Sequence, residues 1–156
     1  MKKIMLLTAS HLAVLLAGFV LGIYLLPILT APVTPSAAQV QAVAGQSDFK
    51  GSFRRDLAGS DLLHWGEGEV SVGRHAIALM GKIAPGPDYK LYLVPEFVEN
   101  EAQFLQLKSR SQRVGDIKTF ENFIVTVPDG VDVAQYTTVL VWCETFSEFI
   151  SAAKYR

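Results

Sequence analysis

The segment from Ile4 to Leu29 contains no Asp, Glu, Lys or Arg. As a helix it would be about 39 Å long, at about 1.5 Å per residue, which exceeds the roughly 30 Å hydrocarbon core of a bilayer. We therefore predict one transmembrane helix at residues 1–29. Lys2 and Lys3 precede the segment, and no further charged residue occurs before Asp48. Because basic residues favour the cytoplasmic side, we expect the rest of the chain outside the cytoplasm, which is the periplasm if the cell is Gram-negative.

Two interpretations of this segment compete. It is either an uncleaved signal anchor, which makes the chain a single-pass membrane protein, or a signal peptide cut after Ser36-Ala37-Ala38. Small residues at alternate positions are typical of such a cleavage site, but the apolar core of a signal peptide is usually about 7–15 residues. The greater length here favours the anchor. Both interpretations export the C-terminal part.

The rest of the chain divides into a linker at residues 30–48 and a domain at residues 49–156. The linker has no charge before Asp48 and consists mostly of Ala, Pro, Val, Gln, Ser, Thr and Gly, a composition typical of connecting segments. Apolar residues make up 50% of the whole chain, which argues against intrinsic disorder. A net charge of -1 and a pI near 6.3 argue against a nucleic-acid partner.

The domain at residues 49–156 alternates apolar and polar residues with a period of two. Tyr89, Leu91 and Leu93 fall on one face of a predicted strand. Similar short runs begin near residues 49, 70, 77, 123 and 139, and Pro-Gly or Asp-Gly turns separate several of them. We therefore predict an all-β fold, an antiparallel β-sandwich or barrel-like domain. Phe146, Phe149, Ile150 and Ala153 have helical spacing, which predicts a short C-terminal helix.

Cys143 is the only cysteine, so the chain can form neither an internal disulfide nor a four-cysteine zinc site. It lies at the end of the apolar run that starts at Val139, just before a predicted turn. Free Cys is most often a small buried hydrophobe. The functional alternatives are a redox-active thiol, a thiolate ligand of a metal or haem iron, and an intermolecular disulfide. No GxSxG, HExxH or phosphate-binding loop is present, so we expect a redox or binding module rather than a stand-alone enzyme.

A reactive thiol needs a positive and partly exposed environment. The neighbouring Glu144 and Glu148 would instead raise the pKa of Cys143, so basic groups would have to come from elsewhere in the fold. Arg74, His75 and Lys154 are the candidates. His64 is a second, weaker candidate ligand beside Cys143, because imidazole binds haem iron, copper and zinc. Trp65 and Trp142 are expected to be packing residues.

Several motifs of the exported part resemble the DM13 domain. The motifs are Phe49-x-Gly51, His64-Trp-Gly66-x-Gly68-x-Val70, Gly86-Pro87-Asp88, Gly115-Asp116-Ile117-Lys118, Asn122 to Pro128, Asp132-x-x-x-Tyr136, Val141-Trp142-Cys143-Glu144-x-Phe146 and Ala152-Ala153. The resemblance implies an extracytoplasmic all-β domain that serves electron transfer or redox chemistry through Cys143. It also implies that this residue acts as a bare thiol or as a ligand for a group such as haem. Since no second redox domain follows, the resemblance implies a separate redox partner protein.

Our first hypothesis is therefore a membrane-anchored extracytoplasmic domain with a redox role for Cys143. The alternative is a non-catalytic binding or structural module of the cell envelope, with Cys143 in its core. A third hypothesis is a β-sandwich that binds a small ligand in an apolar pocket near Trp142.

Overall fold

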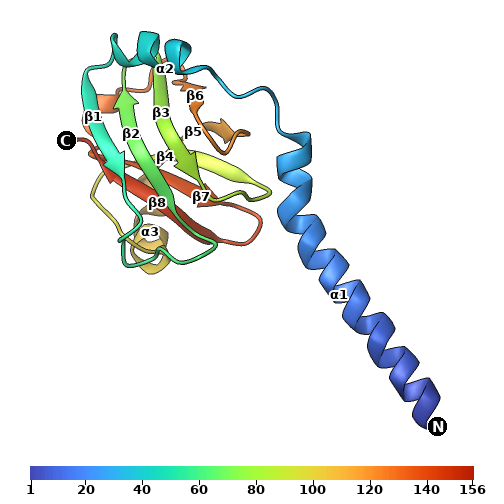
Figure 1. Ribbon diagram of the computed structural model, residues 1–156. Coiled ribbons are helices and arrows are strands. Elements are labelled where there is room, and N and C mark those ends of the chain that lie inside the picture. The colour runs from blue at the N-terminus through green and yellow to red at the C-terminus, as the bar shows by residue number, and fades with distance from the viewer.

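The N-terminal apolar segment forms one long helix. The computed structural model describes all residues from Met1 to Arg156, and in it α1 runs from Lys2 to Thr30 without a single buried residue. This helix is long and apolar enough to cross a membrane, as the sequence predicts. Figure 1 shows α1 extending away from the rest of the chain, which is folded around two β-sheets.

A second, short helix lies inside the segment predicted as a linker. α2 spans Ala37–Ala44 and begins with a capping box. The Ser36 side chain accepts a hydrogen bond from the Gln39 backbone amide, and the Gln39 side chain accepts one from the Ser36 backbone amide. Capping of this kind satisfies the free amides of the first turn. Val40 is only 1% exposed, and α2 packs against β3. Part of the segment at residues 30–48 is thus helical and lies on the sheet.

The eight strands form two four-stranded sheets, and every pair of neighbouring strands is antiparallel. The first sheet has the order β1-β2-β3-β6 and the second β5-β4-β7-β8. The bounds are β1 Phe49–Phe53, β2 Gly66–Val72, β3 Ala76–Ile83, β4 Tyr89–Val94, β5 Gln112–Ile117, β6 Phe123–Thr126, β7 Thr138–Cys143 and β8 Glu148–Lys154. The predicted antiparallel β-sandwich is confirmed. The barrel-like alternative is wrong, because hydrogen bonding does not close the two sheets into one.

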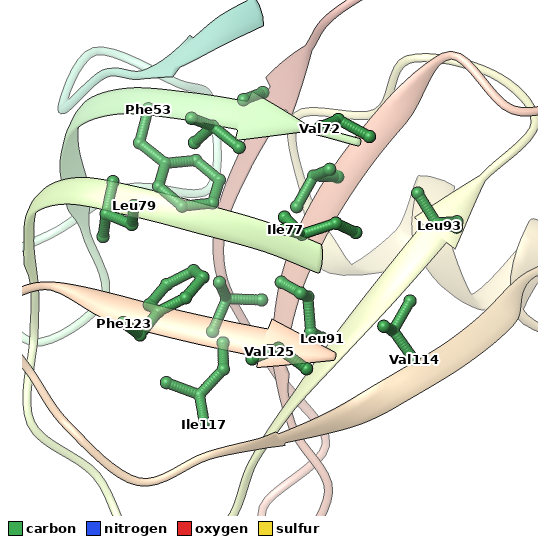
Figure 2. Close-up of a cluster of buried hydrophobic side chains, with 14 of the residues drawn as sticks. Phe53, Val72, Ile77, Leu79, Leu91, Leu93, Val114, Ile117, Phe123 and Val125 are labelled. Carbon is green, nitrogen blue, oxygen red and sulfur yellow. The ribbon is translucent and has the colours of Figure 1, made fainter. Parts of the chain in front are cut away.

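The main core lies between the sheets. Figure 2 shows side chains from both sheets meeting there, among them Ile77 and Phe123 from the first and Leu91 from the second. A second cluster covers the other face of the second sheet. There α3 (Glu101–Leu107) inserts Phe104 against Trp142, with the ring centroids 4.8 Å apart. Short 3-10 helices follow at Lys108–Arg110 (η1) and Val133–Gln135 (η2). The second sheet is therefore buried on both faces.

The predicted C-terminal helix is wrong, because this segment is strand β8. Phe149 packs in the outer cluster and Ile150 in the main core, so adjacent apolar residues serve opposite faces of the sheet. A strand buried on both faces loses the apolar–polar alternation that identifies strands. The apolar residues Phe146, Phe149, Ile150 and Ala153 are spaced by chance at three and four residues, which is the spacing of a helix.

Candidate functional site

Cys143 is the last residue of β7, as the sequence predicts for a thiol at a strand end. It is 2% exposed, has no disulfide partner and belongs to the main core. In the sheet it lies opposite Tyr89 of β4 on one side and Glu148 of β8 on the other. The thiol is thus held by strand pairing on both sides, which is regular toward β4 and interrupted by an irregularity at Val141/Trp142 toward β8.

Cys143 lines a largely apolar pocket of about 540 Å³ between the folded domain and α1. The helix contributes Val20, Leu21, Ile23 and Tyr24 to the lining, and the domain contributes, among others, Tyr89 and His64. The structure therefore brings both sequence-predicted site residues, Cys143 and His64, to one pocket. A pocket of this volume is within the range of small-molecule sites.

His64 is oriented by a carboxylate that the sequence analysis did not identify. Its Nδ1 lies 3.0 Å from Oδ2 of Asp61, and Oδ1 of Asp61 accepts hydrogen bonds from the backbone amides of Leu63 and His64. The hydrogen bond from His64 is the main reason that the pKa of Asp61 is lowered. An acceptor at Nδ1 favours the tautomer with the proton there, which leaves Nε2 as an acceptor. The spacing Asp-x-x-His is the signal that could have revealed this pair.

Tyr89 is the second residue that sequence analysis missed. It is 3% exposed, and burial raises the pKa of its hydroxyl. The hydroxyls of the other two deeply buried tyrosines have partners, the Glu144 carboxylate for Tyr92 and the Val133 carbonyl for Tyr155. No hydrogen bond within the chain involves the Tyr89 hydroxyl. It lies against Gly86, where a side chain would collide with it, so the glycine leaves it room.

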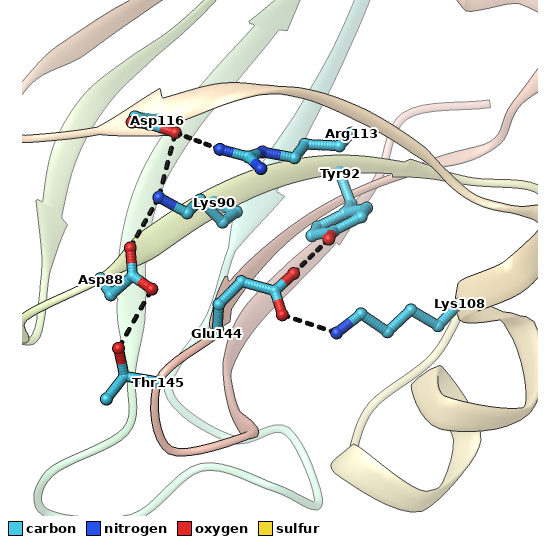
Figure 3. Close-up of polar contacts among 8 residues, drawn as sticks. All are labelled: Asp88, Lys90, Tyr92, Lys108, Arg113, Asp116, Glu144 and Thr145. Atoms are coloured by element: carbon cyan, nitrogen blue, oxygen red, sulfur yellow. Dashed lines mark hydrogen bonds and ion pairs between the residues drawn. The ribbon is translucent and has the colours of Figure 1, made fainter.

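The Cys143 thiol is protonated at neutral pH. Burial raises its pKa above the ordinary value of 9.0, and backbone hydrogen bonds at Phe146 and Asp88 oppose this only in part. The expected direction is confirmed, but the principal cause is burial and not the neighbouring glutamates. Figure 3 shows that Glu144 is engaged elsewhere, with Tyr92 and with Nζ of Lys108 at 2.7 Å.

None of the basic residues considered from the sequence accompanies Cys143. Arg74 and His75 line a different cavity, beside α2. Lys154 pairs with Thr138, at the opposite end of β7 from Cys143. No positive charge from these residues therefore favours a thiolate, which makes a nucleophilic role for Cys143 unfavourable.

The donor set does not fit a bare metal ion. The structure contains no group of three His, Cys, Asp or Glu residues placed to hold one, whereas protein zinc sites use three or four such ligands. A ligating thiol must also lose its proton, which burial of Cys143 opposes. Haem needs only axial ligands, and it stays a prediction of the resemblance.

Of the comparisons with known proteins, one finds a match. The family model described as "Electron transfer DM13" matches residues 56–155. The matched range begins after β1, so Phe49-x-Gly51 lies outside it. Comparison with curated proteins and with solved structures gives no match. Since the matched range is more than half of the chain, the chain belongs to the DM13 family.

Proposed function

We propose that the chain is a membrane-anchored extracytoplasmic redox module whose redox site is the pocket at Cys143. The family description names electron transfer, and the only cysteine lies at a pocket and not in a sealed core. The placement of Cys143 in this pocket is the observation that carries the proposal.

The α1 helix and the charges at its N-terminal end support the proposed membrane placement. The helix has the length and composition of a membrane span, and Lys2 and Lys3 lie at its N-terminal end. The positive end stays in the cytoplasm, so the two-sheet domain faces the outside. Electrons would be exchanged with a separate partner.

The state of the thiol constrains the chemistry. Because burial keeps Cys143 protonated, oxidation of the thiol by one electron must also release one proton. Nε2 of His64, left as an acceptor by the contact of Nδ1 with Asp61, is the base that the pocket offers. The electron passes to an oxidised partner, which is thereby reduced by one electron.

A structural module is the second candidate, because Cys143 is 2% exposed and is a member of the main core. In that case the thiol only packs, and the pocket plays no redox role.

The test uses the full chain purified from membranes in mild detergent. We would record oxidised-minus-reduced absorption spectra. We would also measure the redox state of the thiol as the applied redox potential is varied. We expect a reversible redox signal that Cys143→Ser abolishes while thermal unfolding stays cooperative. The matched control is Val141→Ala, which truncates a buried residue on the same face of β7 outside the pocket and should keep the signal. A chain without any redox signal, in which Cys143→Ser changes only stability, would establish the structural candidate instead.

A further inference from the structure

One wall of the Cys143 pocket is made by the apolar helix itself. Its lining residues from α1 are Val20, Leu21, Ile23 and Tyr24. They lie about 9–15 Å before the helix end at Thr30, at about 1.5 Å per residue. When α1 spans a membrane, the pocket is therefore level with the outer leaflet. We propose that the pocket binds a quinone-type molecule dissolved in the bilayer, with a ring carbonyl at Tyr89 and Cys143 and its apolar tail along α1.

The surface around the pocket is suited to lipid contact. Leu62, Leu63 and Phe146 are 94%, 60% and 49% exposed, and Leu63 and Phe146 line the same pocket as α1. Large apolar side chains exposed together mark interaction sites. Continuity with a membrane-spanning helix identifies the lipid as what covers them. A ligand could then enter from the bilayer without crossing water.

Two of the polar groups that line the pocket are hydrogen-bond donors and suggest the head of the ligand. The Tyr89 hydroxyl has no acceptor within the chain, and the protonated Cys143 thiol is a second donor. The fully buried unpaired side-chain atoms of the chain are in Ser60, Trp142 and Ser151, and not in Tyr89. The Tyr89 hydroxyl is therefore accessible from the pocket, where it can donate to a ligand with acceptor oxygens. The carbonyls of a quinone are such acceptors.

The charges of the pocket exclude other membrane molecules. No Lys or Arg is among its lining residues, so nothing there recognises the phosphate of a phospholipid. A fatty-acid carboxylate would meet Glu148, which also lines the pocket. The ligand class that remains is a molecule with an uncharged polar head group and an apolar tail. The redox activity of this molecule rests on the proposed function. Its origin in the bilayer is argued independently of that function.

The experiment measures binding and not redox activity. The full chain in phosphatidylcholine nanodiscs is titrated with decylubiquinone, and quenching of the tryptophan fluorescence is recorded, since Trp65 adjoins His64 of the pocket in sequence. We expect saturable quenching that Tyr89→Phe weakens about tenfold. The control is Tyr155→Phe, which removes a buried hydroxyl bonded to Val133 outside the pocket and should leave the affinity unchanged. Thermal unfolding verifies that both variants fold.

Further measurements distinguish specific quinone binding from nonspecific quenching. Oleate should not reduce the quenching by decylubiquinone, because its carboxylate would meet Glu148. Quenching that rises without saturation, or equally in wild type and Tyr89→Phe, would overturn the inference. A haem absorption band in the purified chain would overturn it too, while supporting the proposed function. Saturable binding by a chain without redox activity would leave the inference standing and refute the proposed function.

Discussion

Tyr89 and Cys143 are directly paired on the neighbouring antiparallel strands β4 and β7. Both belong to the main core, and both also line the pocket beside α1. Regular strand alternation therefore places a hydroxyl and a thiol at adjacent positions on the inner face of the second sheet. At this end the face is closed in part by α1, which is why two core positions can serve a site.

The protonated state of Cys143 can be measured by alkylation. Because burial raises the pKa of the thiol and only the thiolate reacts, maleimide labelling of the native chain at pH 7 should be about tenfold slower, or more, than labelling in urea. The native rate should rise steadily as the pH passes 9. The variant Cys143→Ser gives the background. Equal rates in the native and unfolded chain would show an exposed, ordinary thiol.

Glu144 should stabilise the fold near neutral pH. Burial alone would raise the pKa of this carboxyl, but hydrogen bonds from Lys108 and Tyr92 outweigh it and hold the pKa below the ordinary 4.5. The stabilisation is therefore present above pH 4.5 and is lost as the pH falls through the lower, folded-state pKa. We expect Glu144→Gln to cost about 1–2 kcal/mol at pH 7, as measured by urea unfolding.

The control for Glu144 is Glu121→Gln. Glu121 pairs with Lys82 at 3.8 Å, and both side chains are more than half exposed, so this change should cost less than about 0.5 kcal/mol. The gap between the Glu144 variant and wild type should also shrink as the pH is lowered. A gap that stays constant from pH 7 to pH 3 would contradict the charge-based explanation.

The sequence predicts those parts of the fold in which apolar residues follow one clear pattern, either a continuous apolar run or a regular alternation with polar residues. α1 needs only its length and apolar composition, and β4 alternates so regularly that its two faces could be assigned, as the separate clusters of Leu91 and Tyr92 confirm. β8 has no such alternation, because both of its faces are buried. No strand was predicted at β5, whose pairing with β4 is interrupted by an irregularity at Leu91/Tyr92.

The site was predictable only in part. The sequence shows that Cys143 is the only cysteine, and it predicts the position of this residue at the end of a strand. That Cys143 shares a pocket with His64 was not predictable, because the loop after β1 and the end of β7 meet only in the folded chain. The wall contributed by α1 and the unpartnered hydroxyl of Tyr89 are likewise tertiary features, which no local spacing encodes.

α2 should contribute to the stability of the two-sheet domain. Val40 is 1% exposed, whereas Val33, in the same predicted linker, is 96% exposed. We expect Val40→Ala to lower the free energy of unfolding by about 1–2 kcal/mol, because it leaves a cavity against the sheet. Val33→Ala is the matched control and should have no measurable effect in urea unfolding. Equal effects of the two changes would indicate that α2 is not packed in solution.

The uncleaved anchor makes a prediction about mass and location. The chain should remain in the membrane fraction after an alkaline carbonate wash, with the full mass of 17.1 kDa, since a single span is not released by breaking ionic contacts. Cleavage after Ala38 would instead give a shorter, soluble chain and would cut through α2, separating Ser36 from Gln39. Mass spectrometry of the membrane and soluble fractions distinguishes these outcomes.

The turn between β7 and β8 contains a residue that glycine would suit better. Ser147 has φ 55°, and it is the only non-glycine residue of the chain with a positive φ. Side chains disfavour this conformation and glycine does not, so Ser147→Gly should stabilise the fold by about 0.5–1 kcal/mol. Ser147→Val should destabilise it. The control is Ser109→Gly in η1 (Lys108–Arg110), where the same substitution should destabilise through added backbone freedom. If Ser147→Gly and Ser109→Gly lower the free energy of unfolding equally, the turn does not hold Ser147 in the left-handed region.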